Sequence, residues 1–237
     1  MASRTITLVG SVAAAFGLAV ALAGCTGGSA APAAKASAAP AHDVPTGTEL
    51  AAALLPATAL PAGFTEDGVG KADSGRALSA AAPTVVLGQA GCSDILNAVG
   101  QPGFGEASYA DDAFTPASAL GEFDETLFEF HGSGAAQFVA GLDSALKHCG
   151  SFNTSDETGG QEAAKLTLGT APKLGQSALS FSVWVNIGGA QMVMTDVAVQ
   201  QGTAVVFVDN STLATSPDAV DLSTLAGQLL GRLPAMP

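Results

Sequence analysis

The sequence feature that most constrains the fold is a series of alternating segments joined by pairs of residues that favour tight turns. Residues 181–187 and 190–200 flank Gly188-Gly189, and Gln201-Gly202 leads into residues 203–209. A period of two is typical of half-buried strands, and Gly-Gly supplies the positive φ of a two-residue hairpin. Because each such turn reverses the chain, we expect consecutive antiparallel strands.

Helical spacing precedes and follows these strands. Ser133 stands before a segment whose apolar residues recur every three or four positions and end at Cys149, and a second such stripe runs from Val220 to Leu233. Further elements are expected as short helices at 48–55 and 92–99 and as strands at 84–87, 106–114 and 122–130. We therefore predict an α+β fold, in which an antiparallel sheet of about five to seven strands carries two main helices packed on one face.

The N-terminus has the layout of a secretory signal peptide. Arg4 precedes an apolar run over residues 6–23, which ends in Leu22-Ala23-Gly24-Cys25. These four residues resemble the bacterial lipobox, in which the cysteine receives a diacylglycerol and the chain is cut just before it. We expect residues 1–24 to be removed and Cys25 to be lipidated. The alternative is an uncleaved membrane helix, for which the run is long enough.

Composition divides the rest of the chain into two parts. Residues 25–47 are mostly Ala, Gly, Ser and Pro, so we expect a disordered tether there, and residues 48–237 are enough for one domain. The formal net charge of −13 repels phosphate backbones, which argues against a nucleic-acid partner.

The three cysteines then have separate roles. If Cys25 carries lipid, Cys92 and Cys149 remain as a pair in a compartment that permits disulfides. A Cys92–Cys149 bridge would staple two helices and stabilise the fold by ~4 kcal/mol in the chain-entropy model. Two buried free thiols are the alternative.

The predicted sheet is apolar on both faces. One face carries Phe181, Val183 and Val185, and the other carries Trp184, Val193 and Val206. Two long helices can cover only one of them, whereas antiparallel sheets commonly leave the second face in water. Either residues 50–87 cover the second face, or Trp184, Val193 and Val206 line an open groove for an apolar ligand or partner.

Recognisable catalytic patterns are missing from the sequence, including G-x-S-x-G, H-E-x-x-H and the Walker loop. The acidic pairs Asp111-Asp112 and Asp124-Glu125 are expected to be solvated, because neighbours on a strand point to opposite faces and the spacing is not that of a calcium loop. His131 and His148 are expected at the two ends of a helix. We therefore predict neither catalytic residues nor a metal or cofactor.

Several of these features together resemble the extracellular sensor-domain family typified by the outer domain of the mycobacterial receptor kinase PknH, which also occurs as free lipoproteins in actinobacteria. The features are Leu54-Leu55-Pro56, a Cys92 that opens a short helix, a Cys149 that ends a longer one, the strand 204–208 and a closing helix. The resemblance implies a central antiparallel sheet with helices packed on it and a cleft for an unidentified ligand. Family members commonly have four cysteines in two bridges, whereas only Cys92 and Cys149 match here.

From these observations we expect a lipid-anchored protein on the outer face of the cell membrane, with a non-catalytic ligand-binding or sensor-like domain. Its partners would be the membrane, through Cys25, and a small-molecule or protein ligand of unidentified chemistry. The alternative is a carrier of an acyl chain or other apolar cargo across the envelope. A third class is a small hydrolase that uses His131 or His148.

Overall fold

The computed structural model describes residues 44–67, 70–78, 83–117, 121–155, 161–187, 189–215 and 220–234. The predicted signal peptide, Cys25 and most of the predicted tether lie outside the described residues. No helix within these ranges is both long and apolar enough to cross a membrane.

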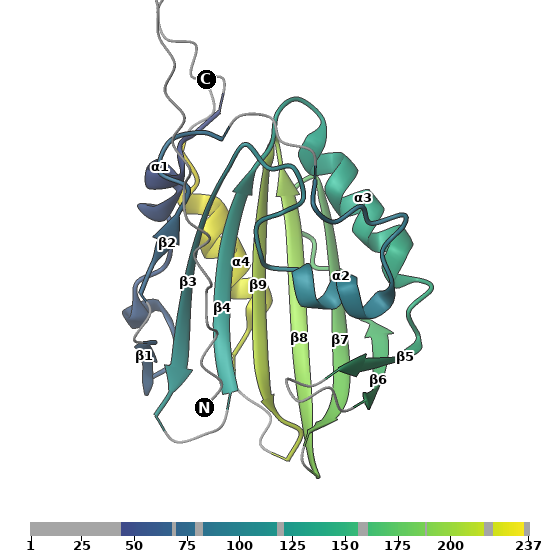
Figure 1. Cartoon of the computed structure of the whole chain (residues 1–237). Helices are drawn as coiled ribbons and strands as arrows, with labels where there is room; N and C mark the ends of the chain where they lie inside the picture. The colour runs from purple at the N-terminus through teal and green to yellow at the C-terminus, as the bar shows by residue number, and fades with distance from the viewer. Residues whose placement is uncertain are drawn as a thin grey trace, which may run out of the picture. The chain divides into compact units, whose positions relative to one another are not determined.

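In the part of the chain that the structure describes, the domain is built on one antiparallel sheet of nine strands (Figure 1). Eight strands follow in the order β1-β3-β4-β9-β8-β7-β6-β5, and β2 also pairs with β3. The strands are β1 (Phe64–Glu66), β2 (Ala72–Asp73), β3 (Ser108–Pro116), β4 (Gly121–Glu129), β5 (Ser151–Ser155), β6 (Gln161–Leu168), β7 (Ser177–Ile187), β8 (Ala190–Gln201) and β9 (Ala204–Leu213).

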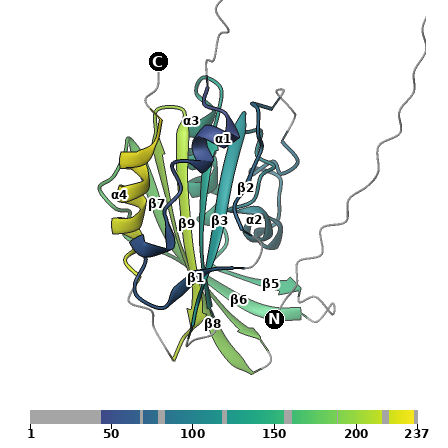
Figure 2. The ribbon, with the colours of Figure 1, turned by 90° about the vertical axis from the view of Figure 1, so that its left-hand side faces the viewer.

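Within the described residues, four α-helices and one 3-10 turn pack on the two faces of this sheet. They are α1 (Gly47–Ala51), α2 (Cys92–Ala98), α3 (Gly134–Leu146), α4 (Leu222–Arg232) and the 3-10 turn η1 (Ala57–Ala59). Figure 2 shows the sheet nearly edge-on, with α4 on one side and α2 on the other. We call the side under α1 and α4 the α4 face, and the side under α2 and α3 the α3 face.

The predicted fold class was therefore wrong in two respects. The sheet has nine strands rather than five to seven, because β1, β2 and β5 are too short to show a clear alternation. The two long helices, α3 and α4, also lie on opposite faces rather than on one. Residues 84–87, predicted as a strand, form bends and a turn.

Each face of the sheet has its own hydrophobic core. On the α4 face, residues of α1, the following loop and α4 pack on Phe114, Phe123, Leu127, Val197, Val199, Val206 and Val208. On the α3 face, α2 and α3 pack on Phe128, Phe181, Val183, Ala198, Val205 and Phe207. The apolar character of both sheet faces, which the sequence shows, is thus explained by helices on both sides.

The hairpin registers follow the sequence closely. In β7–β8, Val185 pairs with Met192 and Val183 with Met194, as the Gly188-Gly189 turn predicts. The next turn lies at 202–203 instead of 201–202, because Gly202 takes the left-handed φ of 61°. Ala198 therefore pairs with Phe207, whereas a turn at 201–202 would pair it with Val205. This change moves the pairing by two residues and leaves every side chain on its predicted face.

The predicted disulfide is present between Cys92 and Cys149, with a Cα–Cα distance of 5.5 Å. Cys92 is the first residue of α2, and Cys149 follows the end of α3. Ser93 Oγ, next to the bridge, lies 3.3 Å from Thr154 Oγ1 of β5. The disulfide therefore holds α2 and α3 together over the β5 end of the sheet.

Two helix starts differ from their predicted positions. Thr46 caps α1 in a reciprocal arrangement with Glu49, so the helix starts at Gly47, one residue before the predicted range 48–55. Asp221 caps α4 by accepting from the Thr224 backbone N–H. α4 therefore starts at Leu222, two residues after the start of the predicted apolar stripe at Val220.

Candidate functional site

The helices on the α4 face cover only part of it. α4 packs on β8 and β9, and α1 packs on β3. Farther along the sheet, β5, β6 and β7 form the floor of a hollow with a volume of about 660 Å³. This size is within the range of small-molecule sites, about 300–1,000 Å³. We call it the Trp184 hollow; its lining includes Asn153, Ala163, Lys165, Trp184, Asn186 and Gln191.

Strand alternation explains why these residues meet in one place. Trp184 pairs directly with Lys165 of β6 on one side and with Val193 of β8 on the other. Cross-strand partners point to the same face, and Val193 belongs with Val197 to the α4 face. The indole is 37% exposed, which is unusual for a residue so often buried.

Polar side chains occupy the adjacent row of the same hollow. Asn186 pairs with Gln191 across the β7–β8 hairpin, and Asn153 pairs with Ala163. Among the described residues, no hydrogen bond or ion pair engages the side chains of Asn153, Asn186 and Gln191, or that of Lys165. These groups are therefore available to a ligand.

The three residues predicted to line one groove are separated in the structure. Trp184 lines the Trp184 hollow, and Val193 lines a second hollow of about 310 Å³ beside Asp221 and Leu222 at the start of α4. Val206 is completely buried in the core beneath α1 and α4. The segment after α1 covers the part of the α4 face around Val206, as one of the two alternatives proposed, whereas the part around Trp184 is open.

Two carboxyl groups on the α4 face are buried, against the expectation of solvated acidic pairs. Asp112 and Glu125 are cross-strand partners with exposures of 1% and 0%. The Leu55 backbone N–H donates to Glu125 Oε1 at 2.7 Å, and Lys71 Nζ lies 3.6 Å from Asp112 Oδ2. Burial raises the pKa of Glu125 to about 8, although the Leu55 N–H acts in the opposite direction.

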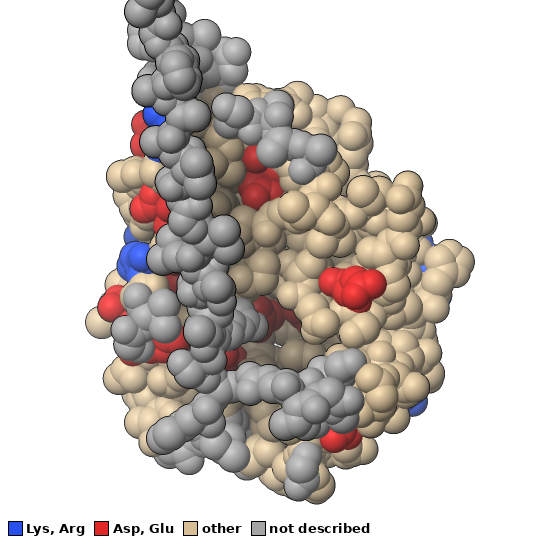
Figure 3. Space-filling model, viewed as in Figure 1, with Lys and Arg blue, Asp and Glu red and all other residues tan. Residues whose placement is uncertain are grey.

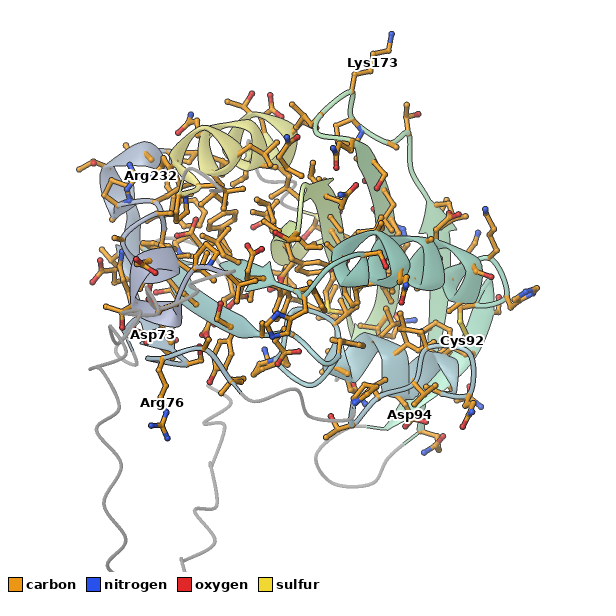
Figure 4. The ribbon with its side chains drawn as sticks, turned by 90° about the horizontal axis from the view of Figure 1, so that it is seen from above. Asp73, Arg76, Cys92, Asp94, Lys173 and Arg232 are labelled. Carbon is orange, nitrogen blue, oxygen red and sulfur yellow. A yellow bond between two sulfur atoms is a disulfide. The ribbon has the colours of Figure 1, made fainter. Side chains whose placement is uncertain are left out.

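Glu125 lies beside a junction between α4 and the segment after α1. Arg232 of α4 donates from Nε to the Ala53 carbonyl at 2.7 Å and from Nη2 to the Leu54 carbonyl at 2.8 Å (Figure 4). Glu125 receives the next backbone N–H along, from Leu55. The polar groups at the end of α1 are thus satisfied from both sides, so we assign Asp112, Glu125 and Arg232 to the architecture rather than to a ligand site.

Acidic residues form a row on the opposite, α3 face. Asp209 pairs with Asp124 on β4 and with Asp196 on β8, so three aspartates stand side by side across three strands. Figure 3 shows acidic atoms gathered in a hollowed region over β9 and its neighbours. Asp196 is buried, and burial followed by the charge of Asp124 raises its pKa well above the usual value. Burial also raises the pKa of Asp111 to about 6.

Neither this row nor the histidines make a recognisable catalytic or metal centre. Across the described ranges, no three His, Cys, Asp or Glu side chains converge as metal ligands would. His131 and His148 are exposed at the two ends of α3. Ser133 occupies the N-cap position of α3, but its hydroxyl accepts from Gln137 Nε2 rather than capping the helix.

The sequence matches no model of a known protein family, and no curated protein sequence matches it. The solved structures that are similar to this chain include the extracellular domain of PknH from Mycobacterium tuberculosis. The TM-score is 0.56 at 10% identity, and the match covers 81% of this chain and 98% of the PknH domain. The two share a fold. At this identity, the likeness extends to the arrangement of helices and strands and no further.

Proposed function

We propose that this chain is a lipid-anchored protein of the outer face of the cell membrane, whose folded domain binds a ligand without transforming it. In this proposal the signal peptide ends at residue 24, Cys25 carries the lipid, and the tether holds a domain of the PknH-like sensor type. The fold shared with an extracellular domain and the Cys92–Cys149 disulfide support an extracytoplasmic location, because disulfides persist in oxidising compartments.

The Trp184 hollow is the observation that carries the binding function. It presents an exposed indole beside side chains of Asn153, Asn186 and Gln191 that are unengaged within the described chain. A mostly preformed concavity with a few convergent polar groups is the usual form of a ligand site. Its described lining holds no His, Cys, Asp or Glu, which favours binding over acid–base or nucleophilic chemistry.

The same lining disfavours the alternative of an acyl-chain carrier. A pocket for a long apolar chain would be lined by aliphatic side chains, because a buried amide without a hydrogen bond is costly. Here Lys165 and three carboxamides surround the single tryptophan. The hollow is therefore better suited to a ligand with both apolar and polar surfaces.

The anchor is tested by metabolic labelling in an actinobacterial host. The wild-type chain should incorporate labelled palmitate and sediment with membranes, and Cys25→Ser should do neither while keeping the same disulfide. Equal labelling of the two proteins, or recovery of full-length wild type from the cytosol, would contradict the lipoprotein proposal.

The binding function is tested with the full chain purified in detergent. The protein is dialysed against a fractionated cell-envelope extract, and retained small molecules are identified by mass spectrometry. We expect at least one compound to be retained by wild type and lost by Trp184→Ala. Leu230→Ala, a substitution on α4 away from the hollow, should retain it. Identical retention by wild type and Trp184→Ala would refute the site.

A further inference from the structure

The chemistry of the Trp184 hollow identifies a class of ligand. Carboxamides both donate and accept hydrogen bonds, and Asn153, Asn186 and Gln191 bring three of them to one place. Sugars present the complementary combination, because their hydroxyl groups also donate and accept while one face of the ring carries only C–H groups. An exposed indole provides a flat surface on which that C–H face can lie.

The spacing of the sheet is suited to a sugar ring. Neighbouring strands lie about 4.8 Å apart and residues two positions apart on a strand about 6.6 Å apart, so Trp184 and the Asn186–Gln191 pair stand in adjacent rows. Ala163, the partner of Asn153, adds only a methyl group to the floor between the amides. A ring stacked on Trp184 can therefore reach the carboxamides with its edge, and a volume of about 660 Å³ leaves room for further rings.

Charge adds a second requirement for the ligand. Lys165 is the only charged residue in the described lining, although the chain has 21 acidic residues against 8 basic ones. Lys165 pairs directly with Trp184 and has no acidic partner among the described residues. The aspartate row lies on the other face of the sheet and on β4, β9 and β8, whereas the floor of the hollow is formed by β5, β6 and β7. The local field of the hollow thus favours an anionic group.

We infer that the ligand of the Trp184 hollow is a short oligosaccharide that carries a carboxylate, such as one containing a uronic acid. One ring stacks on Trp184, the carboxylate pairs with Lys165, and the ring hydroxyls bind Asn153, Asn186 and Gln191. This inference rests on the proposed binding function and specifies its ligand class.

The test uses hyaluronan tetrasaccharide, which alternates uronic acid and N-acetyl sugars, and the neutral N-acetylglucosamine tetramer. Trp184 is the only tryptophan of the chain, so its fluorescence reports the site directly. We expect the acidic tetrasaccharide to shift the emission, protect Trp184 from acrylamide and bind more tightly than the neutral one. Lys165→Met should weaken acidic-sugar binding about three- to fivefold, the factor that ~1 kcal/mol of exposed ion pairing represents.

Lys173→Met is the matched control, because it removes the same charge from a loop that Figure 4 shows extending away from the sheet. It should leave the affinity within twofold, and Lys165→Met should not change binding of the neutral sugar. Equal effects of the two lysine substitutions, equal affinity for both sugars or no binding of either sugar would overturn the inference. If an envelope compound is still retained in a Trp184-dependent way, only the ligand class fails; without such retention, the binding function fails as well.

Discussion

Two parts of the α4 face have the same apolar sequence pattern but differ in their exposure to solvent. Val206 on β9 is completely buried beneath α1 and α4, whereas Trp184, two strands away on β7, is 37% exposed in an open hollow. Both residues alternate with neighbours that face the other side of the sheet. The alternation of residues along a strand therefore predicts the face on which a side chain lies. Whether that side chain is buried depends on the helices that cover this part of the face.

Removal of the disulfide, which supports the open part of the α4 face from the other side of the sheet, should have the largest effect on stability. The strands around the hollow have α2 and α3 on their other face, and the bridge ties those two helices together. The double substitution Cys92→Ser, Cys149→Ser should lower the free energy of unfolding by ~4 kcal/mol in denaturant titrations. Cys25→Ser is the control and should leave the midpoint unchanged. If the double variant unfolds at the wild-type midpoint, the disulfide between α2 and α3 does not contribute to the stability of the strands around the Trp184 hollow.

Truncation of a side chain in the buried part of the α4 face, around Val206, should lower the free energy of unfolding somewhat less than removal of the disulfide. Leu229 of α4 is fully buried against the Val206 region, so Leu229→Ala should destabilise the protein by ~3 kcal/mol through lost burial and a cavity. Its neighbour Leu230 is only partly buried and serves as the control, with an expected loss below ~1.5 kcal/mol. Equal losses for the two leucines would show that α4 does not seal this part of the face.

The sealed part should also respond to pH through Glu125. Its pKa is raised from 4.5 to about 8 by burial in the fold, so the folded state holds a proton that the unfolded state releases. The stabilisation is complete below about pH 4.5 and is lost as the pH rises through about 8, with a slope of at most ~1.4 kcal/mol per pH unit.

Glu125→Gln keeps an acceptor for the Leu55 N–H but cannot ionise. Its unfolding free energy should fall less steeply between pH 5 and pH 8 than that of wild type, measured by urea denaturation at each pH. The Lys165→Met variant should keep the wild-type slope. Parallel slopes for wild type and Glu125→Gln would mean that Glu125 is already ionised in the folded protein at neutral pH.

Substitution in the open part should affect stability least. Trp184→Ala should lower the free energy of unfolding by less than Leu229→Ala does, because the indole is 37% exposed whereas Leu229 is fully buried. In the wild type, acrylamide should quench Trp184 fluorescence readily without ligand. Weak quenching, or a loss of unfolding free energy as large as that of Leu229→Ala, would show that Trp184 is buried in the core. The two parts of the α4 face would then not differ.

Local patterns in the sequence were enough for some of this structure. The Gly188-Gly189 turn predicted the β7–β8 register, and the spacing to Cys149 predicted α3, because both signals depend on residues close in the chain. The separation of the two long helices onto opposite faces depends on tertiary packing, which neither stripe records. Short strands such as β5 were also not predicted, since the sequence of five residues with little alternation resembles that of a loop.

The site shows the same division. The sequence predicted Trp184 as a site residue because it lies on the second apolar face of the sheet. Asn153 and Lys165, which line the same hollow, were not predicted, because they lie on other strands that are brought next to Trp184 by the sheet topology. Asp112 and Glu125 were expected in water because each belongs to an acidic pair whose two members point to opposite faces of a strand, without the spacing of a calcium loop. Their burial depends on the Leu55 N–H, 70 residues away in the chain, and on Lys71. Such long-range partners leave no local signal.

The unequal lengths of the strands have a consequence for how copies of the protein behave near one another. The sheet ends in β1, with three residues, and in β5, with five, whereas the interior strands have up to twelve. Short margins offer few unpaired backbone groups to a neighbouring molecule, and this is one way in which proteins avoid edge-to-edge aggregation. At high concentration, copies of this domain should therefore remain dispersed.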